Sequence, residues 1–222
     1  MLNIQLEQVL PSQIEHRSFE LIQQELDHMG IRLDPENELV IKRAIHTTAD
    51  FEYADSLVFS SHAVKKGMEA LKQGAVIITD TNMGKSGINK RAASALGAEV
   101  LCFMADEDIA REAKERKCTR AVASMEKAVR LFGAPEGTRP CIFAIGNAPT
   151  ALIRLYELVK EGRIKPSLII GAPVGFVNVV QSKELVLTLE DTPYIVARGR
   201  KGGSNVAAAI CNALLYLSLI HI

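Results

Sequence analysis

Hydrophobic and polar positions follow one repeating plan from Gly74 onward: a short apolar run, a turn rich in glycine, proline or asparagine, and an amphipathic helix. Five apolar runs predict buried strands, at Ala75–Thr79, Glu99–Met104, Pro140–Ile145, Ser167–Ile170 and Tyr194–Ala197. Strands without polar alternation are typical of a parallel sheet covered by helices on both faces. The pattern therefore predicts an α/β fold of three layers with a mainly parallel, five-stranded sheet.

Helical periodicity in the other segments completes this plan. The predicted helices of the sheet region are Asn89–Leu96, Asp106–Phe132 with a break near Cys118, Thr150–Glu161, Gln181–Thr188 and Asn205–Leu217. Two more, Ser18–Met29 and Pro35–Ala49, precede it. Since no linker or repeat interrupts the chain, we expect a single domain over residues 1–222, with a helical N-terminal arm (1–73) and a parallel α/β core (74–217). Residues 218–222 do not resemble a natural helix end and are typical of a cloning remnant.

Composition excludes some classes of partner. Lys+Arg and Asp+Glu both number 26, so no overall field attracts nucleic acid or an anionic membrane. The four cysteines are widely spaced, which predicts reduced thiols, and residues 1–11 lack a basic signal-peptide region. The apolar run from Val206 is interrupted by Asn212, which favours a packed helix over a membrane anchor. We therefore expect a cytoplasmic protein without nucleic-acid or membrane partners.

The loops that follow the predicted strands are rich in glycine and polar residues. In an open parallel sheet such loops share the carboxyl edge, where ligands bind. Glycine allows backbone N–H groups to approach a ligand, and a carboxylate or phosphate is the natural occupant. The alternative is that these glycines only make tight turns. The loop Arg198–Ser204 is the most specific, because it places three cations before a helix in a chain without net charge.

Several common site motifs are absent from the sequence. Gly84-Lys85-Ser86 lacks the earlier glycine of a phosphate loop, because Thr79 stands in that position. The same segment misses the serine-hydrolase elbow by one residue, and no dinucleotide fingerprint follows the first predicted strand. His16, His28, His62 and His221 show no metal-ligand spacing. We therefore predict neither a metal nor a cofactor.

The segment Ile41–Glu52 holds a base, a cation and a carboxylate within two turns. If the helix continues through Asp50, the side chains of Arg43, His46 and Asp50 project from one face. A histidine side chain exchanges a proton near neutral pH at little thermodynamic cost. The pattern thus favours His46 as a catalytic acid or base, and a solvated or capping histidine is the alternative.

Six motifs, in this order, resemble the precorrin-8X methylmutase family: Arg17–Phe19, Ile45–Phe51, Thr79–Met83, Gly146–Leu152, Pro173–Val177 and Gly202–Ser204. The resemblance extends from about Gln13 to Leu217. It implies a flavodoxin-like fold and a homodimer with active sites near the subunit interface. It also implies an isomerase of cobalamin biosynthesis that moves a methyl group from C-11 to C-12 of a tetrapyrrole polycarboxylate, giving hydrogenobyrinic or cobyrinic acid.

His46 aligns with the family's catalytic histidine, and we expect it to protonate the macrocycle and so assist a 1,5-sigmatropic shift. Such a shift needs no cofactor. Arg17 and Arg43 fall where the family contacts substrate. The complete set of expected substrate-binding residues is Arg17, Ser18, Arg43, Asp80, Thr81, Asn147, Thr150, Arg198, Gly203 and Ser204.

Two segments depart from the family pattern. Asn178–Gln181 replaces the small residues of many members, and Thr47-Thr48 replaces the Ala-Cys that follows the histidine in some. The residues around His46 are closer to members of the cobalt-early route. Two rival hypotheses remain: a non-catalytic corrinoid-binding protein on the same fold, and an enzyme that binds a phosphate ligand in the glycine-rich loops.

Overall fold

The computed structural model describes residues 7–133 and 139–220, and its centre is a six-stranded sheet in the order β1-β6-β5-β4-β2-β3. The parallel strands are β2 (Val76–Thr79), β3 (Glu99–Leu101), β4 (Cys141–Ile145), β5 (Leu168–Gly171) and β6 (Tyr194–Ala197). All five were predicted from the sequence. The sixth strand, β1 (Leu57–Phe59), pairs antiparallel with the outer side of β6. The predicted mainly parallel α/β fold is confirmed, and β1 extends the sheet by an edge strand within the segment expected to be a helical arm.

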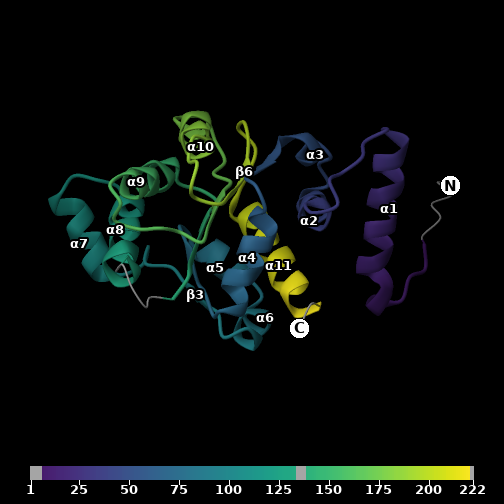
Figure 1. Ribbon diagram of the computed structural model, residues 1–222, viewed down its shortest axis with the longest axis horizontal. Helices are drawn as coiled ribbons and strands as arrows, with labels where there is room; N and C mark the ends of the chain where they lie inside the picture. Colours follow the sequence, from purple (N-terminus) through teal and green to yellow (C-terminus); the bar gives the residue numbers. More distant parts are fainter. Residues whose placement is uncertain (1–6, 134–138, 221–222) are drawn as a thin grey trace, which may run out of the picture.

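One face of the sheet is covered by the N-terminal helices and the last helix (Figure 1). These are α1 (Ile14–His28), α2 (Glu38–Thr48), α4 (Ala63–Lys72), α5 (Asn82–Gly87), α6 (Lys90–Ala95) and α11 (Ser204–Ile220). Helix α11 lies at the centre of this layer and packs against α2, α4 and α5. Its small buried residues, such as Ala207 and Ala208, allow this close approach. Helix α11 continues to Ile220, three residues beyond its predicted end.

The other face is covered by α7 (Glu107–Glu115), α8 (Arg120–Phe132), α9 (Pro149–Lys160) and α10 (Val179–Leu187). Alternate residues of each strand serve the two layers: Ile77 and Ile142 face the α11 side, whereas Val76 and Phe143 face the α8 side. Figure 1 shows α7 at one end of the molecule and α1 at the other. The predicted three-layer arrangement is therefore confirmed.

The apolar pattern missed α4, a helix of 10 residues within the segment expected to be a helical arm, as well as α5 and three shorter elements. The one-turn helices η1 (Pro11–Gln13) and α3 (Tyr53–Ser56) and the strand β1 have too few residues to show a period. The predicted break near Cys118 is confirmed, since Lys117 has a left-handed φ of 53° and Thr119 begins α8. The Thr119 hydroxyl accepts the N–H of Val122 at 3.2 Å, which caps the new helix.

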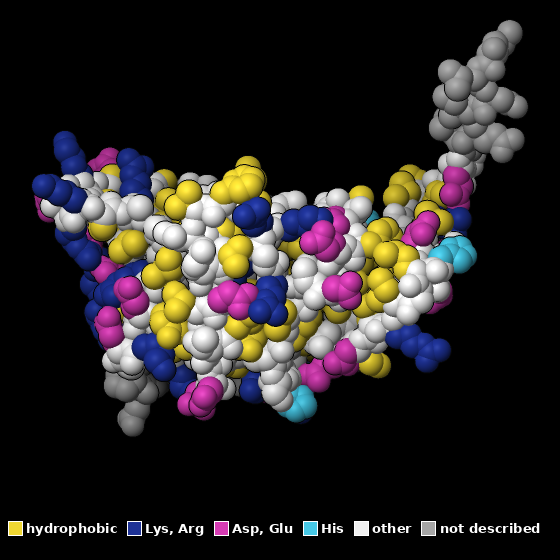
Figure 2. Space-filling model, turned by 90° about the horizontal axis from the view of Figure 1, so that it is seen from above, with side chains coloured by type: hydrophobic (Ala, Val, Ile, Leu, Met, Phe, Trp, Pro, Cys, Tyr) yellow, Lys and Arg dark blue, Asp and Glu magenta, His cyan; other side chains and the backbone are white. Residues whose placement is uncertain are grey.

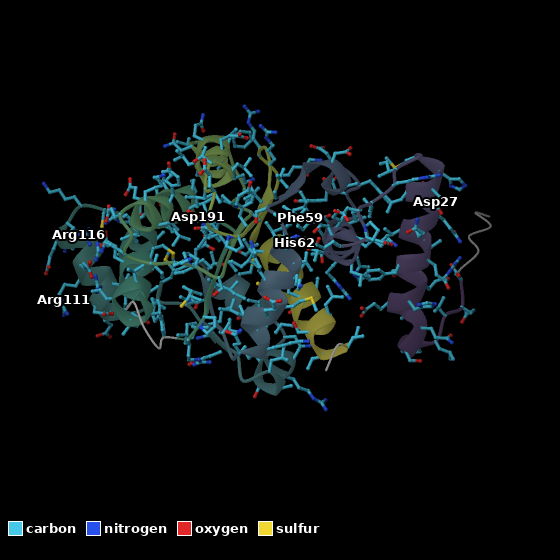
Figure 3. The ribbon with its side chains drawn as sticks, in the orientation of Figure 1. Asp27, Phe59, His62, Arg111, Arg116 and Asp191 are labelled. Atoms are coloured by element: carbon cyan, nitrogen blue, oxygen red, sulfur yellow. The ribbon has the colours of Figure 1, made fainter. Side chains whose placement is uncertain are left out.

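A nearly buried carboxylate joins α7, α8 and α9. The Glu126 side chain is only 8% exposed, and Arg116 donates to both of its oxygens. Arg154 of α9 adds a bond of 2.8 Å from Nε. Figure 3 shows Arg116 at the end of α7, where it reaches the neighbouring helix. These bonds, first of all that from Arg116, lower the pKa of Glu126 below its usual value.

We expect Glu126→Gln to reduce the free energy of unfolding by about 3 kcal/mol at pH 7, because it leaves two arginines without their carboxylate. The folded pKa of Glu126 lies below the unfolded value, so its stabilisation is present above about pH 4.5 and is lost as the pH falls through the folded pKa. Urea denaturation between pH 7 and pH 3 should therefore show the two proteins converging. Glu157→Gln, an exposed partner of Arg154, is the matched control; equal losses in both variants would contradict the prediction.

Candidate active site

The loop that follows β4 is held by a buried carboxylate at the carboxyl edge of the sheet. Asp80 directly follows β2, and its side chain accepts the backbone N–H groups of Gly146, Asn147 and Ala148 at 2.9, 2.9 and 2.6 Å. Burial raises the pKa of Asp80, and the three N–H donors oppose that rise. Since its oxygens are already used by the protein, the structure gives Asp80 a loop-shaping role. Direct substrate contact by Asp80 stays a prediction.

Further bonds join this loop to the start of α11. The hydroxyls of Thr81 and Ser204 lie 2.7 Å apart, and Thr81 also caps α5 by accepting the N–H of Gly84. A Cβ at Gly146 would lie 2.6 Å from the Cα of Ser204, so only glycine allows the two backbones to meet. The N–H of Gly203 donates to the carbonyl of Ala172 at 2.8 Å. The loops after β2, β4, β5 and β6 thus form one continuous surface.

The basic loop after β6 is fixed from both sides. Below it, the fully buried Lys183 of α10 donates to the carbonyls of Gly199 and Lys201, each at 2.8 Å. Burial lowers the pKa of Lys183 to about 8. Above it, the Lys201 ammonium bonds Asp50 at 2.6 Å and also Glu52, just beyond the end of α2. The basic loop and the His46 helix are therefore directly connected.

His46 lies in the last turn of α2 and is exposed. Its ring contacts that of Phe19 on α1, with centroids 5.5 Å apart. The Arg43 guanidinium lies over the same Phe19 ring at 4.8 Å and over the Tyr216 ring at 5.2 Å, and it bonds Glu15 at 2.6 Å. Among the described residues, no protein group forms a hydrogen bond with the imidazole of His46. Both nitrogens of this imidazole therefore lack a protein partner within the described part of the chain.

The expectation that Asp50 shares a helical face with His46 is wrong. Helix α2 ends at Thr48, and Ala49 takes a left-handed φ of 53°, so the chain turns before Asp50. Asp50 instead accepts a hydrogen bond from Lys201, which lowers the pKa of Asp50. Its carboxylate therefore holds the basic loop and does not orient the imidazole of His46. Thr48 donates to the carbonyl of Ala44 at 2.8 Å. The unusual Thr47-Thr48 pair thus supports the helix end through Thr48.

The other expected substrate-binding residues are dispersed. Arg17 bonds Glu7 at 2.7 Å and Glu20 at 3.1 Å, and the Ser18 hydroxyl donates to the carbonyl of Ile14. Both lie on α1 beside Phe19. Thr150 begins α9 and contacts Thr119 at 3.0 Å, whereas the exposed Asn147 lies in the loop held by Asp80.

Arg198 points its Nε to Glu184 at 2.8 Å, on the α10 side of the basic loop. Sequence reasoning missed three residues of the site: Lys183, Lys201 and Phe19. Phe19 and Lys201 stood inside motifs that were noticed, but a lysine in the middle of α10 gives no signal of burial in the sequence. Asn178, which departs from the family pattern, precedes α10 at a left-handed φ of 57°, a conformation that asparagine tolerates.

Figure 2 looks down on this edge of the sheet and shows acidic and basic side chains beside hydrophobic ones over the middle of the molecule. The exposed hydrophobic residues of the loop after β5 include Phe176, which the Arg200 guanidinium covers at 5.5 Å. A hollow lies at the opposite edge of the sheet, where Cys141, Arg163 and Thr192 are among the lining residues. Within residues 7–133 and 139–220, no cluster of potential metal ligands occurs. In the same ranges no helix has the length and apolar character needed to cross a bilayer.

The family model for precorrin-8X methylmutase matches residues 13–217. The chain belongs to the precorrin-8X methylmutase family. It is therefore a methylmutase, an isomerase of cobalamin biosynthesis, as its motifs predicted. A cobalt-precorrin-8 methylmutase of Priestia megaterium is 42% identical to it, over 95% of this chain and 89% of the relative. One from Salmonella typhimurium is 46% identical, over 82% of each chain.

A solved structure supports the same assignment. The precorrin-8X methylmutase of Thermus thermophilus superposes with a TM-score of 0.82 at 35% identity, over 94% of this chain and 98% of that one. A precorrin-8X methylmutase of Pseudomonas aeruginosa is 37% identical, over 90% of this methylmutase and 93% of the relative. The proteins similar to this chain thus include some named for cobalt-precorrin-8 and others named for precorrin-8X.

We expect Asp80→Asn to open the loop after β4. One amide oxygen can keep the bond to Gly146 or those to Asn147 and Ala148, but the new NH₂ would face N–H donors. The free energy of unfolding should fall by about 1–3 kcal/mol, and the KM should rise because the loop moves. Chemical denaturation and steady-state kinetics would measure both effects. Asp191→Asn, at the opposite edge, is the control; a variant of Asp80 as stable as this control would contradict the prediction.

Proposed function

We propose that this methylmutase converts cobalt-precorrin-8 to cobyrinic acid by moving a methyl group from C-11 to C-12 of the macrocycle. The metal-free counterpart, precorrin-8X to hydrogenobyrinic acid, is the second substrate to test. Three relatives, from Leptospira interrogans, Priestia megaterium and Salmonella typhimurium, are named cobalt-precorrin-8 methylmutases and are 41–46% identical to this chain. Their names support cobalt-precorrin-8 as the substrate. The bond from C-11 to the methyl carbon breaks as the bond to C-12 forms, so substrate and product are isomers.

The proposed acid is His46, and the observation that carries this assignment is its exposed, unbonded imidazole on the Phe19 ring. Transient protonation of the conjugated macrocycle lowers the barrier to the methyl shift, and the proton returns to the imidazole afterwards, because substrate and product are isomers. The Phe19 ring holds the imidazole by packing and leaves both of its nitrogens available. General acid catalysis of this kind contributes typically about 10²- to 10⁴-fold.

The proposed anchors for the substrate carboxylates are cations and backbone N–H groups around this imidazole. Arg43 lies one helical turn before His46, and Arg17 and Ser18 lie on the neighbouring α1. The basic loop, which contains Arg198, Gly203 and Ser204, is joined to the end of α2 by the bond from Lys201 to Asp50. Thr81, Asn147 and Thr150 belong to the adjoining loops. Several fixed contacts on one large ligand would align the reacting part of the macrocycle with the imidazole.

The proposed assembly is a cytoplasmic homodimer with the two active sites near the subunit interface. This expectation comes from the family resemblance. It is supported by exposed hydrophobic side chains on the outer helix and its approach, namely Leu10, Ile14 and Leu21. Covering them in a dimer would remove apolar surface from water.

We expect His46→Ala to bind cobalt-precorrin-8 with nearly unchanged affinity and to convert it about 10²- to 10⁴-fold more slowly, because only the proton donor is lost. Stopped-flow absorbance would follow the change in conjugation in single turnovers. His62→Ala, which changes an exposed histidine at the N-cap of α4 that bonds Glu36, is the control. Normal turnover by the His46 variant would place the acid elsewhere. Binding without any conversion by the wild type would support a corrinoid carrier.

We expect Arg198→Ala to raise the dissociation constant for cobyrinic acid by about tenfold, the equivalent of one charge-assisted hydrogen bond. The bound rate should change less, because the anchor contacts substrate and transition state equally. Titration by absorbance and single-turnover rates would separate the two effects, with Arg163→Ala at the opposite edge as control. A defect in rate alone would contradict the anchoring role.

A further inference from the structure

Lys183 is the one lysine of the described residues whose side chain is completely buried. It lies in the middle of α10, and its ammonium donates to two main-chain carbonyls, those of Gly199 and Lys201. Burying an ammonium costs free energy unless its hydrogens find acceptors. A methionine would fill the same space without that cost. The placement of a charge here therefore requires a reason other than packing.

The two carbonyls that Lys183 binds determine where the next peptide N–H groups point. The described peptides are trans, and in a trans peptide the C=O of one residue and the N–H of the next point in opposite directions. When the carbonyls of Gly199 and Lys201 turn inward to the ammonium, the N–H groups of Arg200 and Gly202 turn away from it. Within the described part of the chain, neither N–H has a hydrogen-bond acceptor.

The backbone around these two N–H groups is built for this arrangement. Gly199 and Gly202 have φ angles of 81° and 159°, and a Cβ at Gly202 would lie 2.2 Å from the carbonyl oxygen of Ala172. The Arg200 carbonyl accepts the N–H of Gly175, so the far side of the loop is also fixed. Alternate peptides of the loop thus point inward and outward. Successive outward N–H groups are a common way to bind an anionic oxygen.

We infer that Lys183 is a positioning residue, which turns the N–H groups of Arg200 and Gly202 outward as a paired donor for one substrate carboxylate. The inference rests on the proposed function, because it assigns a subsite for the same polycarboxylate ligand. Lys201 extends the arrangement, since its side chain bonds Asp50 and Glu52 and thereby places the paired donor beside the helix that carries His46. Lys183 itself touches no substrate.

The test is Lys183→Met in the full-length protein, with Lys165→Met, an exposed lysine at the opposite edge, as the matched control. The KM for cobalt-precorrin-8 and the dissociation constant of cobyrinic acid should rise about tenfold or more, which corresponds to about 1.4 kcal/mol. The kcat should stay within about threefold, because the lost contact is present in both substrate and transition state. The melting temperature should fall little compared with this loss of binding, since the substitution also removes a buried charge.

A second measurement uses the wild type and needs no variant to fold. Amide resonances of Arg200 and Gly202 should shift, and their hydrogen exchange should slow, when cobyrinic acid is added. Unchanged amides, a Lys183→Met variant that binds like its control, or a defect in kcat alone would each overturn the inference. If the wild type neither binds nor converts the tetrapyrrole, the proposed function fails as well; if it converts the substrate and only these amides stay unchanged, the inference fails alone.

Discussion

Hydrogen bonds between main-chain groups and two buried charges determine the shape of the carboxyl edge of the sheet. Asp80 gathers three N–H groups of the loop after β4, and Lys183 gathers two carbonyls of the loop after β6. Each buried charge would be costly alone, and each is compensated by the backbone that it organises. The loops therefore cannot relax outward without leaving a charge unpaired in the interior. This makes the edge of the sheet a rigid frame for a large ligand.

The frame is joined from outside the sheet to the helix that carries His46, the proposed proton donor. Helix α2 does not belong to the parallel α/β repeat, yet its C-terminal end lies against the basic loop through the bonds from Lys201 to Asp50 and Glu52. The small residues of α11 let α2 pack closely on the central layer, and Arg43 lies between the rings of Phe19 and Tyr216. A methyl shift within one molecule requires alignment and a proton rather than a covalent partner, and the proposed roles of His46 and the basic loop would supply both.

Much of the site was accessible from the sequence because its motifs lie next to predicted strands. Thr81, Gly146 and Ser204 follow three different strands or begin a helix, so their meeting at one edge follows from parallel topology. His46 was proposed because a base beside a cation stands out on a helix, and its catalytic role stays a prediction. Asp50 was assigned wrongly, since helix α2 ends at Thr48 with a left-handed turn at Ala49, and Asp50 instead bonds Lys201, 151 residues away in the chain, a contact that no local pattern contains.

The sequence by itself determined the parallel strands β2 to β6, most of the helices and the family, because apolar period and motif order can be read along the chain, and it proposed His46 as the catalytic acid. Tertiary structure alone decided the antiparallel β1 and the roles of Asp80, Lys183 and Lys201. A three-residue strand has no period of its own, so pairing with β6 creates it. A charged residue looks solvated in any sequence, and only the packing of α10 and the loops around it shows that Lys183 is buried and whose carbonyls it binds.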